Sequence, residues 1–498
     1  MGRSARGIVA AAIAAAAWFV LIWQSSGYAI DDTYIHLQFA KNLATGNGLS
    51  FTAEAGPVYA CTSPLWVSML AVARLLGEGG LQTARILSSL FGAVSLVLLY
   101  VLSLRTYPRA GPLCFILLAA NPWWIRWSAS GMEATAASAV VLLAILMHTT
   151  GKPPWLVGLV CGLGYLVRPE LAVLGPVLVL DHLLRRRRGS AAGTGVGFLL
   201  PVACWSVFAL FYFGTALPEG ALAKMSHQPL SSYLLGGVFK AGGMLAGSDL
   251  VLLLVSLVFV VPALPSRLKK ARREGWMPMV MLPPAVLLLL LAGRAPIVSR
   301  YLLPAWPPLT LGMTACAIAL TGKLKGFPRN TWIFSLGLLC MVWRLGTGVA
   351  IFYPHMRQMD RNLGVYRDIA RYLRQETPEG SVIAVHEIGV FGYLGNRELL
   401  DLGGLVSPVV REEAFPGFDR NIVESLRLLK REGVTHYMDP HDLVRLASSV
   451  SDRSGIRFEP LESWSFPGGT AFTSRETYER VLYRVRVEPW STLPTGAR

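Results

Sequence analysis

The sequence has few charged residues and few cysteines. Asp, Glu, Lys and Arg make up 15% of its 498 residues, whereas hydrophobic residues make up 53%. A composition this apolar excludes an ordinary soluble protein and is typical of a chain with several membrane spans. Of the six cysteines, all but Cys61 lie in apolar runs. This distribution excludes an external disulfide framework, and no CxxC metal motif occurs.

Sequence signatures of nucleotide binding and of zinc proteolysis are also missing. No Walker A, Gly-x-Gly-x-x-Gly or Gly-x-Ser-x-Gly pattern occurs, which argues against a nucleotide cofactor or a nucleotide-bound donor. His386 and Glu387 begin an HExxH-like stretch, but Val390 occupies the position of the second histidine. A zinc protease is therefore not expected.

The residues that give the chain its formal net charge of +16 are unevenly distributed along the sequence. The basic residues gather between apolar runs, in every second loop, as the positive-inside rule requires of cytoplasmic loops. This pattern argues against nucleic acid as a partner, because the charge follows the membrane topology. The clusters are Arg3/Arg6, Arg105/Arg109, Lys152, Arg185 to Arg188, Arg267 to Arg273, and Lys323/Lys325/Arg329.

The apolar runs predict a polytopic α-helical membrane protein with about eleven transmembrane helices and a cytoplasmic N-terminus. Ile8 to Ser25 reads as an uncleaved first span, with a signal peptide as the alternative. Since the number of spans is odd, the C-terminal tail lies outside. The further runs cover about 84–104, 111–128, 134–150, 155–170, 171–184, 190–213, 249–265, 276–293, 301–320 and 331–352.

Two domains are expected. Residues 1–352 form the transmembrane domain, with external loops at 27–83, 121–133, 168–170, 214–248 and 293–300, and residues 353–498 form a small external α/β domain. In the first loop we expect surface helices over Asp32–Ala44 and from Pro64, the latter capped by Ser63. The tail predicts helices at Val365–Gln375 and Asn421–Glu432, and strands at Ser381–Val385, Arg397–Leu402 and Thr435–Met438.

Asp31 and Asp32 follow the first span directly. Adjacent carboxylates near a membrane are costly because like charges and low dielectric both oppose ionisation. The pair could act as a catalytic base, as a cation ligand, or as one of each, although Asp31 could simply cap the next helix. His36 lies one helical turn after Asp32. Glu133 is the next external carboxylate that could join them, unless it only serves a helix N-terminus.

Several cations are predicted on the external side, against the positive-inside trend. A lipid phosphate would explain them, since Arg and Lys bind phosphate well. Snorkelling anchors are the alternative, and Arg168 could also form a local ion pair with Glu170. The candidate phosphate ligands are Arg126, Arg168, Lys224 and Arg300.

The order of several motifs resembles one known superfamily. DDTYIHLQFAKNLATGNGLSF and TSPLW are followed by SGMEA, RPE, GTALPEGALAK, RYLLP and LLDLGGLVSP. This order is similar to that of the GT-C superfamily of integral membrane glycosyltransferases, in a bacterial branch that includes terminal arabinofuranosyltransferases. The resemblance runs from about residue 28 to 408.

The resemblance implies a sugar donor carried on polyprenyl phosphate and a cell-envelope acceptor, used at the external face of a bacterial inner membrane. Asp31 would be the base, while Asp32 and Glu133 would assist or, with Asp31, hold a divalent cation (Mg, Mn or Ca). The external cations would hold the lipid phosphate, and His36, Glu170 and His386 would contact substrate. Two departures are Glu219, where many relatives carry Asn, and His386, where relatives carry a small residue or Asp.

Two other functional classes remain open from the residues alone. A transporter or lipid flippase would use the acidic residues as a proton or ion relay, and should place ionisable groups in mid-membrane, where Arg344 is the main example. An assembly or sensor protein without catalysis would bind a partner through its tail.

Overall fold

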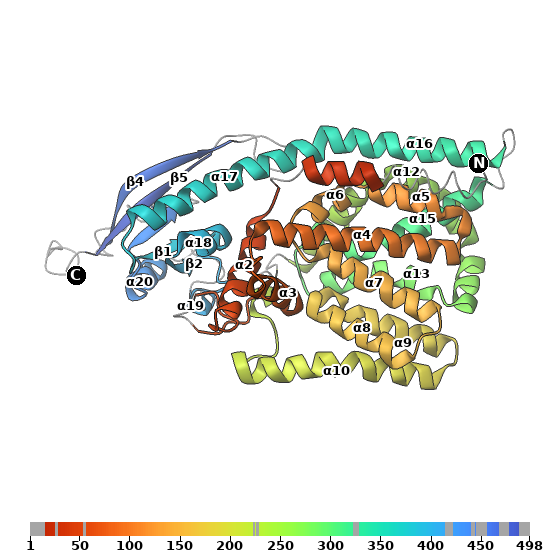
Figure 1. Ribbon diagram of the computed structural model, residues 1–498, viewed down its shortest axis with the longest axis horizontal. Helices are drawn as coiled ribbons and strands as arrows, with labels where there is room; N and C mark the ends of the chain where they lie inside the picture. The colour runs from red at the N-terminus through yellow and green to blue at the C-terminus, as the bar shows by residue number, and fades with distance from the viewer. Residues whose placement is uncertain are drawn as a thin grey trace.

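The protein consists of a long helical bundle with a five-stranded sheet at one end (Figure 1). The computed structural model describes residues 15–24, 28–52, 56–222, 225, 229–321, 328–413, 422–439, 444, 456–467 and 478–487. The expected polytopic helical protein with a small α/β domain is confirmed at this level. The predicted site residue Lys224 lies outside the described residues.

Helices run back and forth along the bundle. A first apolar helix covers Ala15–Gln24. The others are α4 (Leu81–Thr106), η1 (Pro108–Ala110), α5 (Gly111–Ala119), α6 (Pro122–Ala129), α7 (Ala134–Thr149), α8 (Pro154–Val167), η2 (Pro169–Val173), α9 (Leu174–Leu184), α10 (Arg188–Phe213), α11 (Glu219–Leu222), α12 (Leu230–Glu274), α13 (Met277–Ala292), α14 (Ser299–Leu302), η3 (Leu303–Ala305), α15 (Trp306–Thr321) and α16 (Arg329–Thr347).

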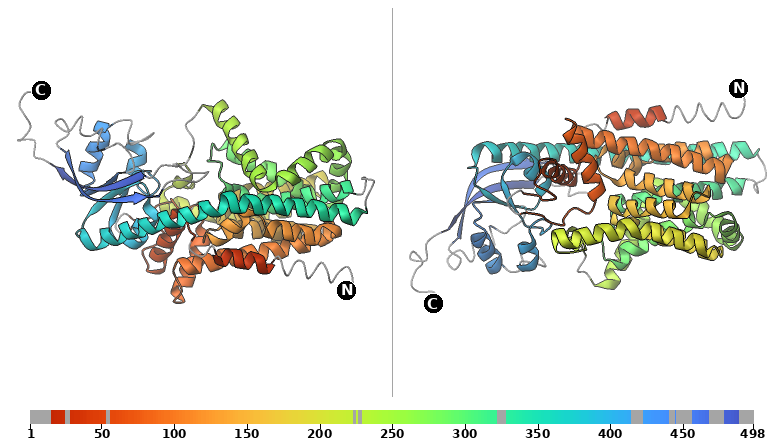
Figure 2. Two further views of the ribbon diagram at one scale, coloured as in Figure 1. Left: turned by 90° about the horizontal axis from the view of Figure 1, so that it is seen from above. Right: turned by 60° about the horizontal axis from the view of Figure 1, so that its bottom comes forward.

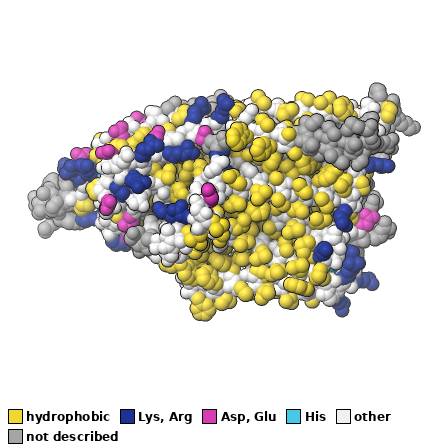
Figure 3. Space-filling model, in the orientation of Figure 1, with side chains coloured by type: hydrophobic (Ala, Val, Ile, Leu, Met, Phe, Trp, Pro, Cys, Tyr) yellow, Lys and Arg dark blue, Asp and Glu magenta, His cyan; other side chains and the backbone are white. Residues whose placement is uncertain are grey.

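The face of the bundle seen in Figure 3 is broadly apolar. Within the described residues, five helices are long and apolar enough to cross a membrane, and the bent pair of α6 and α7 adds a sixth if it forms one span. Several other predicted spans correspond to shorter helices, so the number eleven stays a prediction. The long candidates are Leu81–Thr106, Arg188–Phe213, Leu230–Ser256, Ser299–Ala319 and Asn330–Glu376.

Three of the basic loops lie at the end of the bundle away from the sheet. The ends of α4, α7 and α9, which precede the Arg105/Arg109, Lys152 and Arg185 to Arg188 clusters, point to that end (Figure 1). Figure 3 shows Lys and Arg side chains gathered there and mixed charges over the sheet domain. This separation agrees with the positive-inside pattern of the sequence.

The prediction of an external loop over 214–248 is wrong for its second half. Helix α12 begins at Leu230 and continues to Glu274, with a kink at Asp249, where φ is −132° and ψ is 22°. The buried Asp249 carboxylate pairs with Arg344 and accepts hydrogen bonds from Asn121 and Trp306. These bonds satisfy the buried charge of Asp249. In the sequence the same charged residue interrupts the apolar run, so hydropathy alone places the start of the span there.

The predicted first external loop contains the two helices expected in it, α2 (Asp31–Ala44) and α3 (Pro64–Leu75). Pro64 takes the first position of α3, as expected. Ser63 takes the N-cap position, as expected, but its hydroxyl makes no hydrogen bond to a described residue. Asp31 likewise does not cap α2, whose N-cap is Ile30.

The sheet domain follows the long helix α17 (Tyr353–Glu376), which continues α16 through a π-helical turn, η4 (Gly348–Phe352). Figure 2 shows this helix running from the bundle to the sheet. The sheet has the order β2-β1-β3-β5-β4, with β1 parallel to β2 and β3 and the β4–β5 hairpin antiparallel. Its elements are β1 (Val382–Val385), α18 (Ile388–Gly395), β2 (Glu398–Asp401), α19 (Pro408–Glu413), α20 (Ile422–Arg431), β3 (His436–Asp439), β4 (Ile456–Phe466) and β5 (Tyr478–Val487).

Helix α18 carries the main contact between the sheet domain and the first external loop. Its backbone N–H groups at Gly389 and Val390 donate to the Asp31 carboxylate at 2.8 and 2.9 Å. Gly389 and Gly392 lie against Asp31 and Phe51 with no room for a Cβ atom. The spacing of the two glycines places them on one face of α18, and this bare face allows the close approach.

We expect Gly389→Ala to loosen this contact. The added Cβ would overlap the carbonyl oxygen of Asp31, and overpacking of this kind costs about 1–3 kcal/mol. The melting temperature of the detergent-solubilised protein should fall by several degrees, and proteases should release the sheet domain sooner. Gly395→Ala is the control in the same helix, since its Cβ would meet only the carbonyl oxygen of Ala370 at 3.8 Å. Equal effects of the two substitutions would contradict the close contact at Gly389.

Candidate active site

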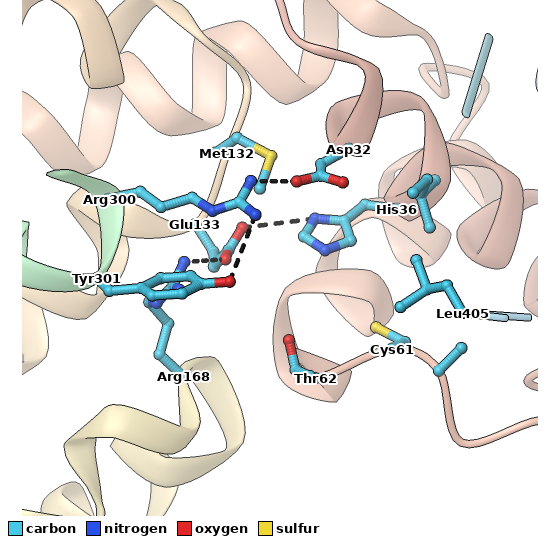
Figure 4. A pocket seen from close by; sticks show the side chains of 12 residues that line it. Asp32, His36, Cys61, Thr62, Met132, Glu133, Arg168, Arg300, Tyr301 and Leu405 are labelled. Atoms are coloured by element: carbon cyan, nitrogen blue, oxygen red, sulfur yellow. Dashed lines mark hydrogen bonds and ion pairs between the residues drawn. The ribbon is translucent and has the colours of Figure 1, made fainter. Parts of the chain in front are cut away.

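A pocket opens where the loop that follows the first apolar helix, the bundle and the sheet domain meet (Figure 4). Its polar side chains come from five separate segments of the chain, and most of them are paired with one another. The lining residues are Asp32, Ile35, His36, Ala60, Cys61, Thr62, Met132, Glu133, Arg168, Arg300, Tyr301 and Leu405.

The pair formed by Asp32 and Arg300 is at the centre of the pocket. Asp32 lies in the first turn of α2, where a carboxylate is favoured by the positive end of the helix dipole. Its Oδ2 atom accepts a hydrogen bond from Nη1 of Arg300. The Arg300 guanidinium also lies 5.2 Å from the centre of the Tyr301 ring. The aspartate of the external loop is thus held by a cation from the start of α14.

A second ion pair joins Arg168 to Glu133 and Glu170. Pro169 ends α8 and gives Arg168 an extended backbone, with φ −154° and ψ 131°, as expected for a residue before proline. Arg168 donates two hydrogen bonds to Glu170, at 3.0 and 2.9 Å, and a third to Glu133. Its guanidinium lies 4.8 Å from the centre of the Tyr301 ring, so Tyr301 contacts both arginines.

His36 completes the polar wall. Burial lowers the pKa of this histidine below its ordinary value, against the opposing effect of nearby Glu133, so His36 is neutral at neutral pH. Its Nδ1 atom lies 3.4 Å from Oε2 of Glu133. Both atoms are buried, and neither has a hydrogen-bond partner among the described residues. Unpartnered buried polar atoms are costly, and a hydroxyl group of a ligand could satisfy both.

The predicted site residues fall into two groups. Asp32, His36, Glu133, Arg168 and Arg300 line the pocket, while Glu170 is held behind it by Arg168. Arg126 is elsewhere: it donates to the Tyr28 hydroxyl at 2.6 Å and lies over the rings of Trp123 and Trp127. His386 follows β1 and is partly buried, and it is not among the pocket residues.

Asp31 and Asp32 have different partners although they are adjacent. Asp31 is not among the residues that line the pocket, and both its carboxylate oxygens accept backbone hydrogen bonds from α18. Burial raises the pKa of Asp31 to about 7, although these two hydrogen bonds lower it. The structure therefore places Asp31 at the contact between domains and Asp32 in the pocket.

The acidic side chains do not form a metal-binding group. Among the described residues, no three or more His, Cys, Asp or Glu side chains are arranged to hold a metal ion. Asp32 faces Arg300 and Glu133 faces Arg168, so each carboxylate is already neutralised by a cation. The expected ligand set of Asp31, Asp32 and Glu133 does not fit a divalent ion in this arrangement, because both oxygens of Asp31 accept backbone hydrogen bonds from α18.

Sequence reasoning did not identify several lining residues. Tyr301 directly follows Arg300 in SRYLLP, Cys61 directly precedes the TSPLW segment, and Thr62 is its first residue, so all three lie in or beside recognised motifs. Leu405 lies in LLDLGGLVSP, whose glycines indicated only turns. An apolar side chain in a loop gives no signal of its own chemistry, and only the packing reveals its place in the pocket.

Known proteins are similar to different parts of this chain. Residues 355–481 match a family model described as Domain of unknown function (DUF8728). A terminal beta-(1->2)-arabinofuranosyltransferase of Mycobacterium tuberculosis is 32% identical over 41% of this chain. The aligned part spans only 35% of that protein.

Solved structures match nearly all of the chain. ArnT from Cupriavidus metallidurans, bound to undecaprenyl phosphate, superposes with a TM-score of 0.59 at 13% identity, covering 97% of this chain and 98% of that one. The oligosaccharyltransferase AglB from Archaeoglobus fulgidus, in complex with an inhibitory peptide and a dolichol-phosphate, gives 0.56 at 10% identity, covering 90% and 70%. ArnT and AglB are GT-C glycosyltransferases.

The chain has the GT-C fold. The resemblance suggested by the order of the sequence motifs is thereby confirmed. In this fold the pocket lies at the junction of the bundle, the loop with α2 and α3, and the sheet domain.

Proposed function

We propose that this protein is a glycosyltransferase that moves a sugar from a polyprenyl-phosphate donor to a cell-envelope acceptor. The observation that carries the proposal is the convergence of Asp32, Glu133 and His36 with Arg168 and Arg300 in one pocket. Arginines bind phosphate well, and a carboxylate can accept the proton of a hydroxyl group. The GT-C fold, shared with a protein solved with undecaprenyl phosphate, supports the same reading.

In the proposed reaction Arg300 and Arg168 bind the phosphate of the donor. The acceptor hydroxyl attacks the anomeric carbon, a new carbon–oxygen bond forms, and the bond from that carbon to the phosphate oxygen breaks. Asp32 takes the proton of the hydroxyl, and polyprenyl phosphate leaves with the bonding electrons. The free Nδ1 of His36 and Oε2 of Glu133 bind sugar hydroxyls and orient the ring.

The ion pair between Asp32 and Arg300 has a role in this proposal. Before the donor binds, Arg300 neutralises Asp32 and makes it a poor proton acceptor. An incoming phosphate competes for the same guanidinium, because charge-assisted hydrogen bonds to phosphate are at least as strong. Donor binding would release the carboxylate as the acceptor hydroxyl arrives, so the base becomes active only in the loaded enzyme.

We propose that the protein has the membrane topology predicted from its sequence. Residues 1–352 would form the catalytic transmembrane domain and residues 353–498 the external domain, with the N-terminus in the cytoplasm of a bacterium and the pocket at the outer face of its inner membrane. The separation of the basic loops from the sheet domain supports this orientation.

An ion relay is the competing function. The buried pair of Asp249 and Arg344 is the strongest argument for it, because ionisable groups inside a membrane often mark ion pathways. The carboxylate of Asp249, however, also accepts hydrogen bonds from Asn121, Trp306 and Ser248. A group at a kink of α12 whose partners lie on α12, α15 and α16 and at the N-cap of α6 fits a structural role better than a relay.

The test of the proposed function combines turnover and lipid binding. We expect membranes with the wild-type protein to transfer radiolabel from at least one member of a panel of polyprenyl-phosphate sugars. Arg300→Gln should weaken binding of polyprenyl monophosphate by about 10- to 100-fold, since hydrogen bonds to charged groups contribute about 1.5–3 kcal/mol. The lipid-induced rise in melting temperature measures this binding.

Arg357→Gln is the matched control. Arg357 is an exposed arginine of α17 whose guanidinium donates to Tyr353, and its loss should leave lipid binding unchanged. If the wild type consumes no donor and gains no stability from polyprenyl monophosphate, the proposed function is wrong.

A further inference from the structure

We propose that the loop from Asp401 to Ser407 makes the sheet domain a specificity element, in which Leu405 selects an uncharged sugar on the donor. The inference rests on the proposed function, since it assigns a ligand to the same pocket. It assigns a function to part of residues 355–481, which match a domain of unknown function.

The loop is rigid because one buried carboxylate organises it. Asp401 is 1% exposed, and its side-chain oxygens accept backbone hydrogen bonds from Gly403, Leu405 and Val406 at 2.9, 2.5 and 2.8 Å. Gly404 has a φ of +67°, which favours glycine. The turn is thus fixed at several backbone positions, and the side chain of Leu405 is presented in one place.

The same loop is fastened to the transmembrane domain. A Cβ atom on Gly220 would meet both Cδ1 of Leu405, at 2.9 Å, and the backbone carbonyl of Ala60. Glu219 of the same short helix, α11, accepts a hydrogen bond from Arg411 at 2.9 Å. Leu405 therefore lies beside α11, and it lines the pocket together with Ala60.

The pocket is polar at one end and largely apolar at the other. Figure 4 shows Arg300, Arg168 and Tyr301 on one side of His36, and Leu405 and Cys61 on the other. A phosphate bound by the arginines leaves the attached sugar to extend past His36 toward Leu405. The far edge of the sugar would then contact a leucine from the sheet domain.

The chemistry of this end decides which sugars fit. The carbon-bound hydrogens of a sugar ring can pack against a leucine side chain. This contact removes apolar surface of both groups from water, which is favourable. A charged substituent placed there would lose its water beside lining residues that carry no charge, such as Leu405, Cys61 and Ala60, and burying an unpaired charge is strongly unfavourable. Leu405 should therefore favour neutral sugars and reject a donor whose sugar carries an ammonium or carboxylate group.

The experiment compares affinities and does not depend on turnover. The probes are polyprenyl monophosphate alone and the same lipid carrying a neutral pentose, a neutral hexose or a cationic amino sugar. We expect the wild type to prefer the neutral sugars over the cationic one by about tenfold or more. Leu405→Asp should reverse this preference, and Leu405→Ala should reduce it, while the affinity for the bare lipid stays near that of the wild type.

Two further variants control for folding and packing. Val406→Ala removes an apolar side chain from the same loop that is 7% exposed and does not line the pocket, and it should keep the wild-type preference. Leu405→Met keeps the apolar bulk and should keep it as well, even if Leu405→Asp folds poorly.

The outcomes separate the two proposals. If the bare lipid does not bind, the proposed function and this inference both fail. If it binds but Leu405→Ala and Leu405→Asp leave the preference among sugars unchanged, only the inference is overturned. A change of preference as large in Val406→Ala would also overturn it, because the effect would then come from the loop as a whole.

Discussion

Asp32→Asn will reduce sugar transfer by about 10²- to 10⁴-fold, the range that a positioned general base contributes. Binding of the donor lipid should stay at the wild-type level or become tighter. The reason is that the neutral amide no longer competes with phosphate for the guanidinium of Arg300, which holds Asp32 in the free protein. Single-turnover transfer and lipid-induced thermal stabilisation, measured on the same preparation, separate the two effects.

Asp31→Asn is the matched control for this variant. The carboxylate of Asp31 accepts from the backbone of α18 and does not line the pocket. We therefore expect a smaller loss of transfer together with weaker attachment of the sheet domain, seen as faster proteolytic release. If Asp31→Asn abolishes transfer with the domain still attached, while Asp32→Asn remains active, the assignment of the base to Asp32 is wrong.

Arg168→Gln will destabilise the protein by about 3–5 kcal/mol, the usual result of removing one partner from a buried ion pair. Arg168 is 3% exposed and is the shared partner of Glu133 and Glu170, so its loss leaves two carboxylates buried beside a neutral amide. We expect a large fall in the melting temperature and low yield from membranes. Chemical denaturation in detergent gives the free energy of unfolding.

A double variant tests whether charge is the cause. Arg168→Gln combined with Glu133→Gln removes one of the stranded charges and should recover part of the lost stability, since residues in one ion-pair network do not act additively. Glu133→Gln alone keeps Arg168 paired with Glu170 and should cost much less. A double variant no more stable than Arg168→Gln would show that packing, not charge, causes the loss.

The sequence was most informative about ionisable residues. Each of the pocket residues Asp32, His36, Glu133, Arg168 and Arg300 could be predicted because a charged or titratable group beside a membrane needs a reason to be there. Leu405 could not be predicted in the same way. Leucine is ordinary anywhere in this chain, and its role depends on a turn organised by a distant carboxylate.

The choice between Asp31 and Asp32 shows a limit of local sequence. Neighbouring residues of a helix point in directions about 100° apart, so one of two adjacent aspartates can face the pocket while the other faces α18. Which one does so depends on how α2 packs against elements more than 250 residues away, as the hydrogen bonds of Asp31 to Gly389 and of Asp32 to Arg300 show.

The strands of the sheet domain were predicted where they are short and buried. β1, β2 and β3 follow from their apolar runs, but the hairpin of β4 and β5 was missed. Along β4 most side chains are exposed or partly buried, because it forms the edge of the sheet. Its charged and polar residues hide the alternation that identifies a half-buried strand.

Helices α16 and α17 are joined by η4 without a break, so the position of the sheet domain at the pocket depends on the length of this continuous helix. Each residue of a helix adds about 1.5 Å of length and 100° of rotation, so the number of residues between the bundle and β1 sets both the height of the sheet domain and the direction it faces. Loss of one residue from α17 would turn Leu405 away from Arg300 by more than a quarter of a circle. Substrate choice in such an enzyme could thus change through the length of one helix while every residue of the pocket stayed the same.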